Sequence, residues 1–493
     1  MFQRHRANSK SNSVALFNYR ARVTFLLALS LLLSATRSPI AGQVAPQAAR
    51  DFKLEAHAAA ANSQWEQAAA SYQKAIEIQP RDADLRVDLG AALANSGRQT
   101  DAIASYEAAL RIAPRNLPAE LGLAQSYRAV HNYDETRRML ERAHREHPAK
   151  AAPLAALGDL ELELQTYDAA IGHLKAAVAL DPSDTKTRNF LAAAYKAKGD
   201  QENALQQLAN VLARDPQNAL AYFLRAQIYS DRNEAARALP DAERAVALQP
   251  KNPSARLVLA KILVRAPENA QPSEFTARCA RAVSLLEPLL TTKAGDSETL
   301  FLLSRAYRCA GREDQAQKTV SAFEAASQND RTTKQQQLEA KHLVDEAEEH
   351  AMKNDFPAAL DLLQQAVEKD PTFSPAYSLL AKLNYSAGNL ERAGEAISQA
   401  LKISPNVPDF LYVQGKIFEK EGKLDEALAA FQRITLVNPR ESDAYFEMGV
   451  IYQQRNDRPR ALAAYKKASE LSPDDADYRR AVAALSAAAP AKP

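Results

Sequence analysis

The chain has 493 residues, of which 46% are hydrophobic and 25% charged, so it is long enough to bury a large core and ordinary for a soluble protein. Its formal net charge is +2 at pH 7, and residues 1–42 carry six Lys and Arg residues but no acid, which leaves −4 for the remainder. This mildly acidic balance argues against nucleic acid as a partner.

The N-terminal residues have the pattern of an export signal. A basic stretch ending at Arg22 leads into thirteen uncharged residues, Val23–Ala35, and then into a polar break. Thirteen residues fall short of the roughly 18 that cross a bilayer as a helix. We interpret residues 1–42 as a signal peptide cleaved after Gly42, with a retained membrane anchor as the alternative. We therefore expect an exported protein, periplasmic or secreted, or else a single-pass anchored protein that faces the periplasm.

Prolines then recur with a fixed step of 34 residues, each at the end of a stretch with helical hydrophobic spacing. Such a period indicates a solenoid of paired helices. The interval from Pro250 to Pro371 holds three further repeats and nineteen extra residues, which we place around Arg265–Phe275 and Arg331–Glu339. The two series are Pro80, Pro114, Pro148, Pro182, Pro216 and Pro250, and then Pro371, Pro405, Pro439 and Pro473.

Within each repeat, the residue sizes recur with the prolines. With the proline as position 32, position 8 is small, position 20 is usually alanine and position 24 is large, as in Gly90, Ala102 and Tyr106. Small residues allow two helices to approach closely, and the large ones fill the space beside them. Proline then ends the second helix because it lacks an N–H group.

This pattern resembles the tetratricopeptide repeat family, most clearly in "LGAALANSGRQTDAIASYEAALRIAP" (Leu89–Pro114). The resemblance implies an all-α helix-turn-helix solenoid, a right-handed superhelix of about twelve repeats. We place the parts as follows: repeats 1–8 in residues 49–330, with repeat 7 extended over about 253–296; a long helix over 331–353 that enters repeat 9; repeats 9–12 in 340–475; and a capping helix over 476–489.

Catalytic motifs are absent from the sequence. It contains no GxxxxGK[ST], HExxH, GxSxG or GxGxxG, so we expect no enzymatic activity and no cofactor. His144 and His147 stand three residues apart, a spacing that suits two metal ligands, but we interpret them as a solvated helix end and expect no metal.

The two cysteines fall near one edge of the expected stack. Cys279 lies near the start of the second helix of repeat 7, and Cys309 near the end of the first helix of repeat 8. Since adjacent helices run antiparallel, and an exported protein keeps disulfides, we predict a Cys279–Cys309 bridge. Two unpaired, half-buried thiols are the alternative.

The resemblance also implies where a partner binds, since the first helices of such repeats line a concave groove. The densest basic group at groove positions is Lys261, Arg265, Arg305 and Arg308, next to Phe301, which suits a carboxylate or acidic segment of an extended peptide. Further aromatic groove positions are Phe223, Tyr385, Tyr412 and Phe446.

We therefore expect a non-enzymatic protein–protein interaction scaffold outside the cytoplasm that binds a partner or an extended peptide in the concave groove. The alternative is a membrane-tethered assembly factor for envelope or exopolysaccharide export. The identity of the partner and the oligomeric state stay open.

Overall fold

The computed structural model describes residues 41–265, 271–290 and 297–487, and the side chains from residue 47 onward. The predicted export segment falls almost entirely on residues 1–40, outside the described residues. In the described ranges no helix has both the length and the apolar character needed to cross a membrane. The described residues form two compact parts, which divide between Ala119 and Glu120.

The first part is built from helix pairs in which each helix packs on the next along the chain. Its described helices are α2 (Ala41–Ala61), α3 (Trp65–Ile78), α4 (Ala83–Asn95) and α5 (Gln99–Ile112), and α6 (Leu117–Ala129) contains the boundary with the second part.

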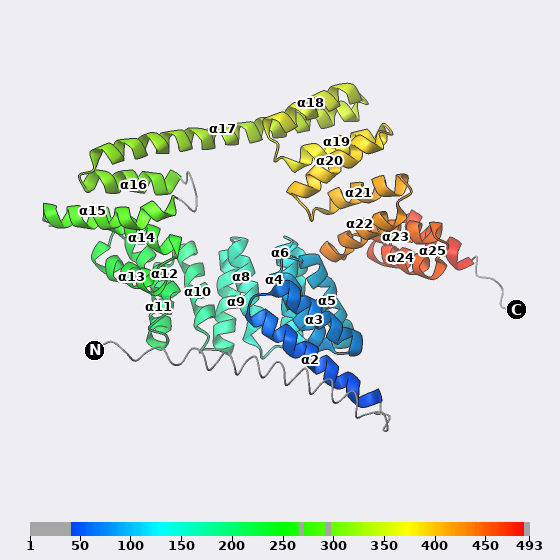
Figure 1. Ribbon diagram of the computed structural model, residues 1–493, viewed down its shortest axis with the longest axis horizontal. Coiled ribbons are helices and arrows are strands. Elements are labelled where there is room, and N and C mark those ends of the chain that lie inside the picture. The colour runs from blue at the N-terminus through cyan, green and yellow to red at the C-terminus, as the bar shows by residue number, and fades with distance from the viewer. Residues whose placement is uncertain (1–40, 266–270, 291–296, 488–493) are drawn as a thin grey trace, which may run out of the picture. The chain divides into compact units, whose positions relative to one another are not determined.

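The second part continues in the same manner, with successive helices lying side by side (Figure 1). Its described helices before the long helix are α7 (Tyr133–Glu146), α8 (Ala151–Glu163), α9 (Tyr167–Leu180), α10 (Thr185–Lys198), α11 (Gln201–Arg214), α12 (Ala219–Asp231), α13 (Ala235–Leu248), α14 (Pro253–Leu263), α15 (Pro272–Leu286) with the short 3₁₀ helix η1 (Glu287–Leu289), and α16 (Ser297–Cys309). They are followed by α17 (Glu313–Met352), α18 (Phe356–Lys369), α19 (Ser374–Ser386), α20 (Leu390–Ile403), α21 (Pro408–Lys420), α22 (Leu424–Val437), α23 (Ser442–Gln454), α24 (Arg458–Leu471) and α25 (Ala476–Ala487). No strand occurs in these described ranges, and the predicted all-α solenoid is confirmed.

Each turn between repeats contains the residues that end one helix and the residues that begin the next. After Pro80, Pro182, Pro216 and Pro250, an Asp or Asn two residues beyond the proline caps the next first helix, whereas Lys150, Phe373, Val407 and Glu441 at the equivalent position give no side-chain cap. The Asp82 carboxylate accepts a hydrogen bond from the Asp84 N–H at 2.9 Å, and the Asn218 side chain accepts one from the Ala221 N–H at 3.0 Å. Such caps satisfy N–H groups that a helix start otherwise leaves unpaired. The 34-residue step therefore fixes both helix ends.

The small residues at position 8 lie against the large residues at position 24 of the same repeat. A Cβ added at Gly90 would lie 2.7 Å from Tyr106 Cε1, and one added at Gly415 would lie 2.6 Å from Phe431 Cζ. Carbon atoms in contact normally stay about 3.5–4.0 Å apart, so even an alanine methyl would overlap the ring. Ala102, at position 20, is fully buried. The two helices of a repeat therefore approach as closely as the residue sizes predict.

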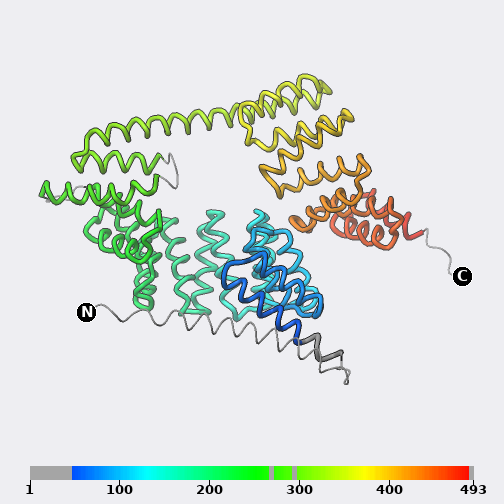
Figure 2. The backbone as a smooth tube through the Cα atoms, viewed as in Figure 1, coloured from blue at the N-terminus to red at the C-terminus, as the bar shows by residue number. Residues whose placement is uncertain are grey.

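The long helix α17 serves two repeats. It packs on α16 near its start and on α18 near its end, and Figure 2 shows it as one uninterrupted helix. It has 40 residues, and the buried Ala316 and Val344 mark its two packed ends. The predicted helix over 331–353 thus begins already at Glu313, because no proline or glycine interrupts the segment between them. Residues 331–338, in the middle of α17, are exposed.

A disulfide joins Cys279 on α15 to Cys309 at the end of α16, with a Cα–Cα distance of 5.7 Å. These are the two cysteines of the sequence. The bridge ties the second helix of repeat 7 to the first helix of repeat 8, and Cys279 is fully buried.

Candidate functional site

A cavity of about 770 Å³ runs along the first helices of three successive repeats, α6, α8 and α10. Its apolar lining comes from Leu121, Ala155 and Phe190, and its polar lining includes Arg128 and Asp159. This concavity thus lies along the first helices, where the resemblance places the groove, but none of the predicted site residues lines it.

Arg128 is paired with two of the carboxylates that line this cavity. Arg128 Nη1 lies 2.6 Å from Asp159 Oδ2, and Arg128 Nε lies 2.5 Å from Glu163 Oε2. The Tyr133 hydroxyl also donates a hydrogen bond to Glu163, at 3.0 Å. The pKa of Glu163 lies below its usual range, because the hydrogen bonds from Arg128 and Tyr133 outweigh the opposing effect of desolvation. Arg128 therefore already has two anionic partners in this cavity.

The groove section formed by α14 and α16 is different, because its central cations have no anionic partner. Across the described residues, no ion pair involves Lys261 or Arg305. The Arg305 guanidinium lies over the Phe301 ring, 5.8 Å from its centroid, and Phe301 is 45% exposed. The helices α14 and α16 share one hydrophobic core cluster, so Lys261 and Arg305 stand on neighbouring first helices of the groove.

The other two basic residues predicted for this group are used differently. Arg265 Nη1 donates a hydrogen bond to the Ser230 carbonyl at 2.8 Å and lies 3.3 Å from Asn233 Oδ1, so Arg265 ties α14 to the end of α12. Arg308 is exposed, with Glu313 at 3.9 Å. Arg265 therefore acts chiefly between repeats, whereas Arg308 stays accessible.

Lys196 on α10 extends the positive charge along the groove. Its pKa is lowered, first by desolvation and also by the positive charge of Lys261, although Asp231 acts in the opposite direction. Its Nζ donates a hydrogen bond to Gln227 Oε1 on α12 at 2.8 Å. We call Lys196, Lys261, Arg305 and Arg308 the basic segment. The predicted site omitted Lys196, because its half-buried position beside Lys261 depends on the packing of α10, α12 and α14.

Elsewhere in the groove, cations are paired across neighbouring first helices. Lys382 on α19 lies 2.8 Å from Asp409 on α21, and Lys416 on α21 lies 3.0 Å from Glu447 on α23. The pair between Arg128 on α6 and Asp159 on α8 follows the same rule. Lys261 and Arg305 therefore differ from these three cations, because no ion pair involves them among the described residues.

The remaining predicted aromatic residues are mostly engaged in packing. Phe223 and Tyr385 are half-buried against the cores beneath them. The Tyr412 hydroxyl donates a hydrogen bond to Glu447 at 2.7 Å, and burial together with this bond raises the pKa of Tyr412. The Phe446 ring lies 5.2 Å from the Tyr465 ring and 5.0 Å from the Tyr478 ring of α25. Among the predicted aromatic groove residues, Phe301 is thus the one that the fold leaves most open.

The stacked helix pairs, with a wall of first helices, define an α-solenoid. Sequence profiles of the tetratricopeptide repeat match residues 53–116, 121–185, 161–228, 225–271, 350–417 and 412–476. These segments cover more than half of the chain, which therefore belongs to the tetratricopeptide repeat family.

Solved structures of the same kind also match the chain. A tetratricopeptide repeat protein from Parabacteroides merdae is 17% identical, with 53% of this chain and 99% of that chain covered and a TM-score of 0.41. YrrB, described as a TPR protein with an unusual peptide-binding site, is 27% identical, with coverages of 38% and 96% and a TM-score of 0.31. Human IFIT1 is 14% identical, with coverages of 78% and 88% and a TM-score of 0.38. No curated protein matches the sequence.

Proposed function

We propose that the chain is a non-enzymatic scaffold outside the cytoplasm that binds an extended, acidic segment of a partner protein along α10, α12, α14 and α16. The observation that carries this proposal is the basic segment. Two of its cations, Lys261 and Arg305, form no ion pair among the described residues, whereas Arg128, Lys382 and Lys416 are paired.

The chemistry of the basic segment favours carboxylates in an extended chain. Arginine binds a carboxylate through two parallel hydrogen bonds, and such charge-assisted bonds are the strong ones. The exposed Phe301 ring beside Arg305 offers an apolar contact to the side chain between two acidic residues. Lys196 is half-buried, and desolvation lowers its pKa even though Asp231 is nearby, so an incoming carboxylate stabilises its charged form further.

A direct test uses fluorescence anisotropy with labelled twelve-residue peptides that alternate Leu with Glu, Lys or Ser. We expect the Glu peptide to bind most tightly, with an affinity that falls as salt rises. In the double variant Arg305→Glu, Arg308→Glu, binding of the Glu peptide should weaken at least about tenfold.

The matched control is the double variant Arg244→Glu, Lys251→Glu, which makes the same change in charge at exposed positions on α13 and just beyond it. It should bind the Glu peptide within about twofold of the native chain, because only screened long-range charge changes. Equal losses in both variants, or no preference for the Glu peptide, would contradict the proposed site.

The location outside the cytoplasm is supported by the export-signal pattern of residues 1–42 and by the disulfide, which persists in oxidising compartments. N-terminal sequencing of the mature chain tests it. A chain that starts just after Gly42 supports export and release, whereas a chain that retains Val23–Ala35 favours the membrane-tethered assembly factor.

A further inference from the structure

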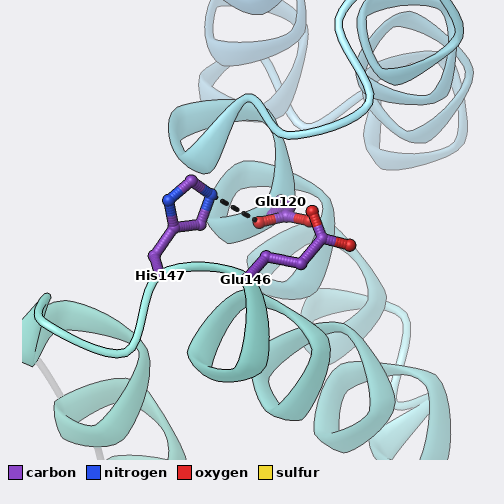
Figure 3. Close-up of side chains that lie close together, drawn as sticks. All are labelled: Glu120, Glu146 and His147. Carbon is purple, nitrogen blue, oxygen red and sulfur yellow. Dashed lines mark ion pairs between the residues drawn. The ribbon is translucent and has the colours of Figure 1, made fainter.

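A second polar cluster lies at the end of repeat 3 and is separate from the basic segment. Glu120 is in the first turn of α6, Glu146 is the last residue of α7, and His147 follows directly at the helix end. One ligand atom from each of the three residues lies within 4.8 Å of the others. Figure 3 shows the Glu120 carboxylate between the His147 ring and the Glu146 carboxylate.

The spacing of the His147 and Glu120 atoms suits a bound cation better than a hydrogen bond. His147 Nε2 is buried, makes no hydrogen bond within the described part of the chain, and lies 3.5 Å from Glu120 Oε2. Around a tetrahedral Zn²⁺ with bonds of about 2.0–2.2 Å, two donor atoms stand about 3.4 Å apart. The two atoms already have that separation.

The next repeat provides a contrasting pair. His173 Nδ1 lies 2.8 Å from Glu161 Oε2, which is a hydrogen-bond distance and leaves no room for an ion between the two atoms. Glu161 is buried in the same way as Glu120, at 1% and 0% side-chain exposure. We call His173–Glu161, which is hydrogen-bonded, the closed pair, and His147–Glu120, whose atoms stand farther apart, the open pair.

The charges around the open pair also suit a divalent ion. Arg142 Nε lies 3.2 Å from Glu120 Oε1 and 2.8 Å from Glu146 Oε1. The atom of Glu120 that faces His147 is the other carboxylate oxygen, Oε2. Arginine in this position orients the carboxylates, as groups around metal ligands commonly do. Glu120, which belongs to this cluster, is fully buried. A buried charge of this kind is stabilised by a cation.

We propose that Glu120, Glu146 and His147 bind a divalent transition-metal ion of the zinc type, with water as the fourth ligand. One imidazole and two carboxylates form a donor set that suits Zn²⁺ and disfavours Ca²⁺ and Mg²⁺, which take oxygen ligands. Glu146 and His147 are partly exposed, at 27% and 20%, so the ion enters from solvent. The ion links the start of α6 to the end of α7 and closes repeat 3. This inference does not depend on the proposed function of the groove.

The test is isothermal titration of the full-length chain, first stripped of metal with a chelator, with Zn²⁺ alone. We expect one Zn²⁺ per chain, an unfolding temperature that rises with Zn²⁺, and no comparable effect of Ca²⁺ or Mg²⁺. His147→Gln should weaken Zn²⁺ binding at least about tenfold and abolish the thermal effect. His173→Gln, the matched control on the closed pair, should leave both unchanged.

A second variant, Glu146→Gln, removes a partly exposed ligand with little change in shape, and it decides the outcome if His147→Gln does not fold. Absence of Zn²⁺ binding to the native chain would overturn the inference. The inference also fails if the folded His147→Gln or Glu146→Gln variant binds Zn²⁺ as tightly as the native chain does.

Discussion

Two glycines of repeat 4 provide a sharp test of how its helices pack. Gly158 lies inside α8 and Gly172 inside α9, so both are in helix interiors. A Cβ at Gly158 would overlap Leu174 Cγ and lie 2.7 Å from Leu174 Cδ2, whereas a Cβ at Gly172 would meet nothing within 4 Å. Leu174 is fully buried, so it has little freedom to move aside.

The two substitutions Gly158→Ala and Gly172→Ala share one favourable effect. Replacing glycine by alanine inside a helix stabilises the fold by about 1 kcal/mol. At Gly172 this gain stands alone, so we expect the variant to be more stable by about 0.5–1 kcal/mol. At Gly158 overpacking of a full core costs about 1–3 kcal/mol in addition. Because the helix-propensity gain cancels in the comparison, the two variants should differ by about 1–3 kcal/mol.

Urea unfolding followed by circular dichroism measures this difference. The native chain and both variants should be compared at one temperature, with the unfolding slopes checked for equality, because long repeat arrays do not always unfold in one step. Equal stability of the two variants would refute the tight contact between α8 and α9.

Three further outcomes follow from the same packing. Ala204→Leu, at a fully buried position 20 of α11, should lower the free energy of unfolding by about 1–3 kcal/mol, and an unchanged melting temperature would contradict the assigned repeat register. Thiol titration of the unfolded, unreduced chain should find no free thiol, and replacing Cys279 and Cys309 by serine should cost about 3–4 kcal/mol for a loop whose ends are 30 residues apart; two reactive thiols would exclude the bridge. Burial raises the pKa of Tyr106 to about 12, so its neutral form favours the folded state and that contribution is lost as the pH rises from about 10 to about 12. From about pH 9 to about pH 11, the urea concentration at the unfolding midpoint should therefore fall less for Tyr106→Phe than for the native chain. An equal fall for both proteins would contradict this contribution.

The repeat architecture was readable from the sequence because each feature has a local physical cause. Proline ends a helix at a fixed step, and the size contrast between Gly90 and Tyr106 or Gly415 and Phe431 reflects one contact inside each repeat. The 40-residue length of α17 was harder to predict from the sequence, because a charged stretch without proline or glycine does not show where the helix begins.

The site chemistry was less predictable, because it depends on which side chains meet across repeats. Lys382 and Lys261 occupy equivalent groove positions, yet Lys382 has Asp409 beside it and Lys261 has Lys196. The cluster of Glu120 with His147 joins residues that are far apart in sequence, and the spacing of His144 and His147 pointed to a different pair. The first grouping follows from the stacking of neighbouring repeats and the second from the packing of the two helices of repeat 3, and neither follows from a short motif.

The most direct test of the proposed groove is photo-crosslinking in intact cells from a benzophenone amino acid placed at Phe301. A control variant carries the same benzophenone amino acid at Arg244, an exposed position on α13, the second helix of its repeat. We predict that Phe301 alone crosslinks to an acidic, extended segment of an exported protein, identified by mass spectrometry of the joined peptide. Crosslinks shared equally by both positions, or a joined peptide without acidic residues, would contradict the groove as the site of recognition.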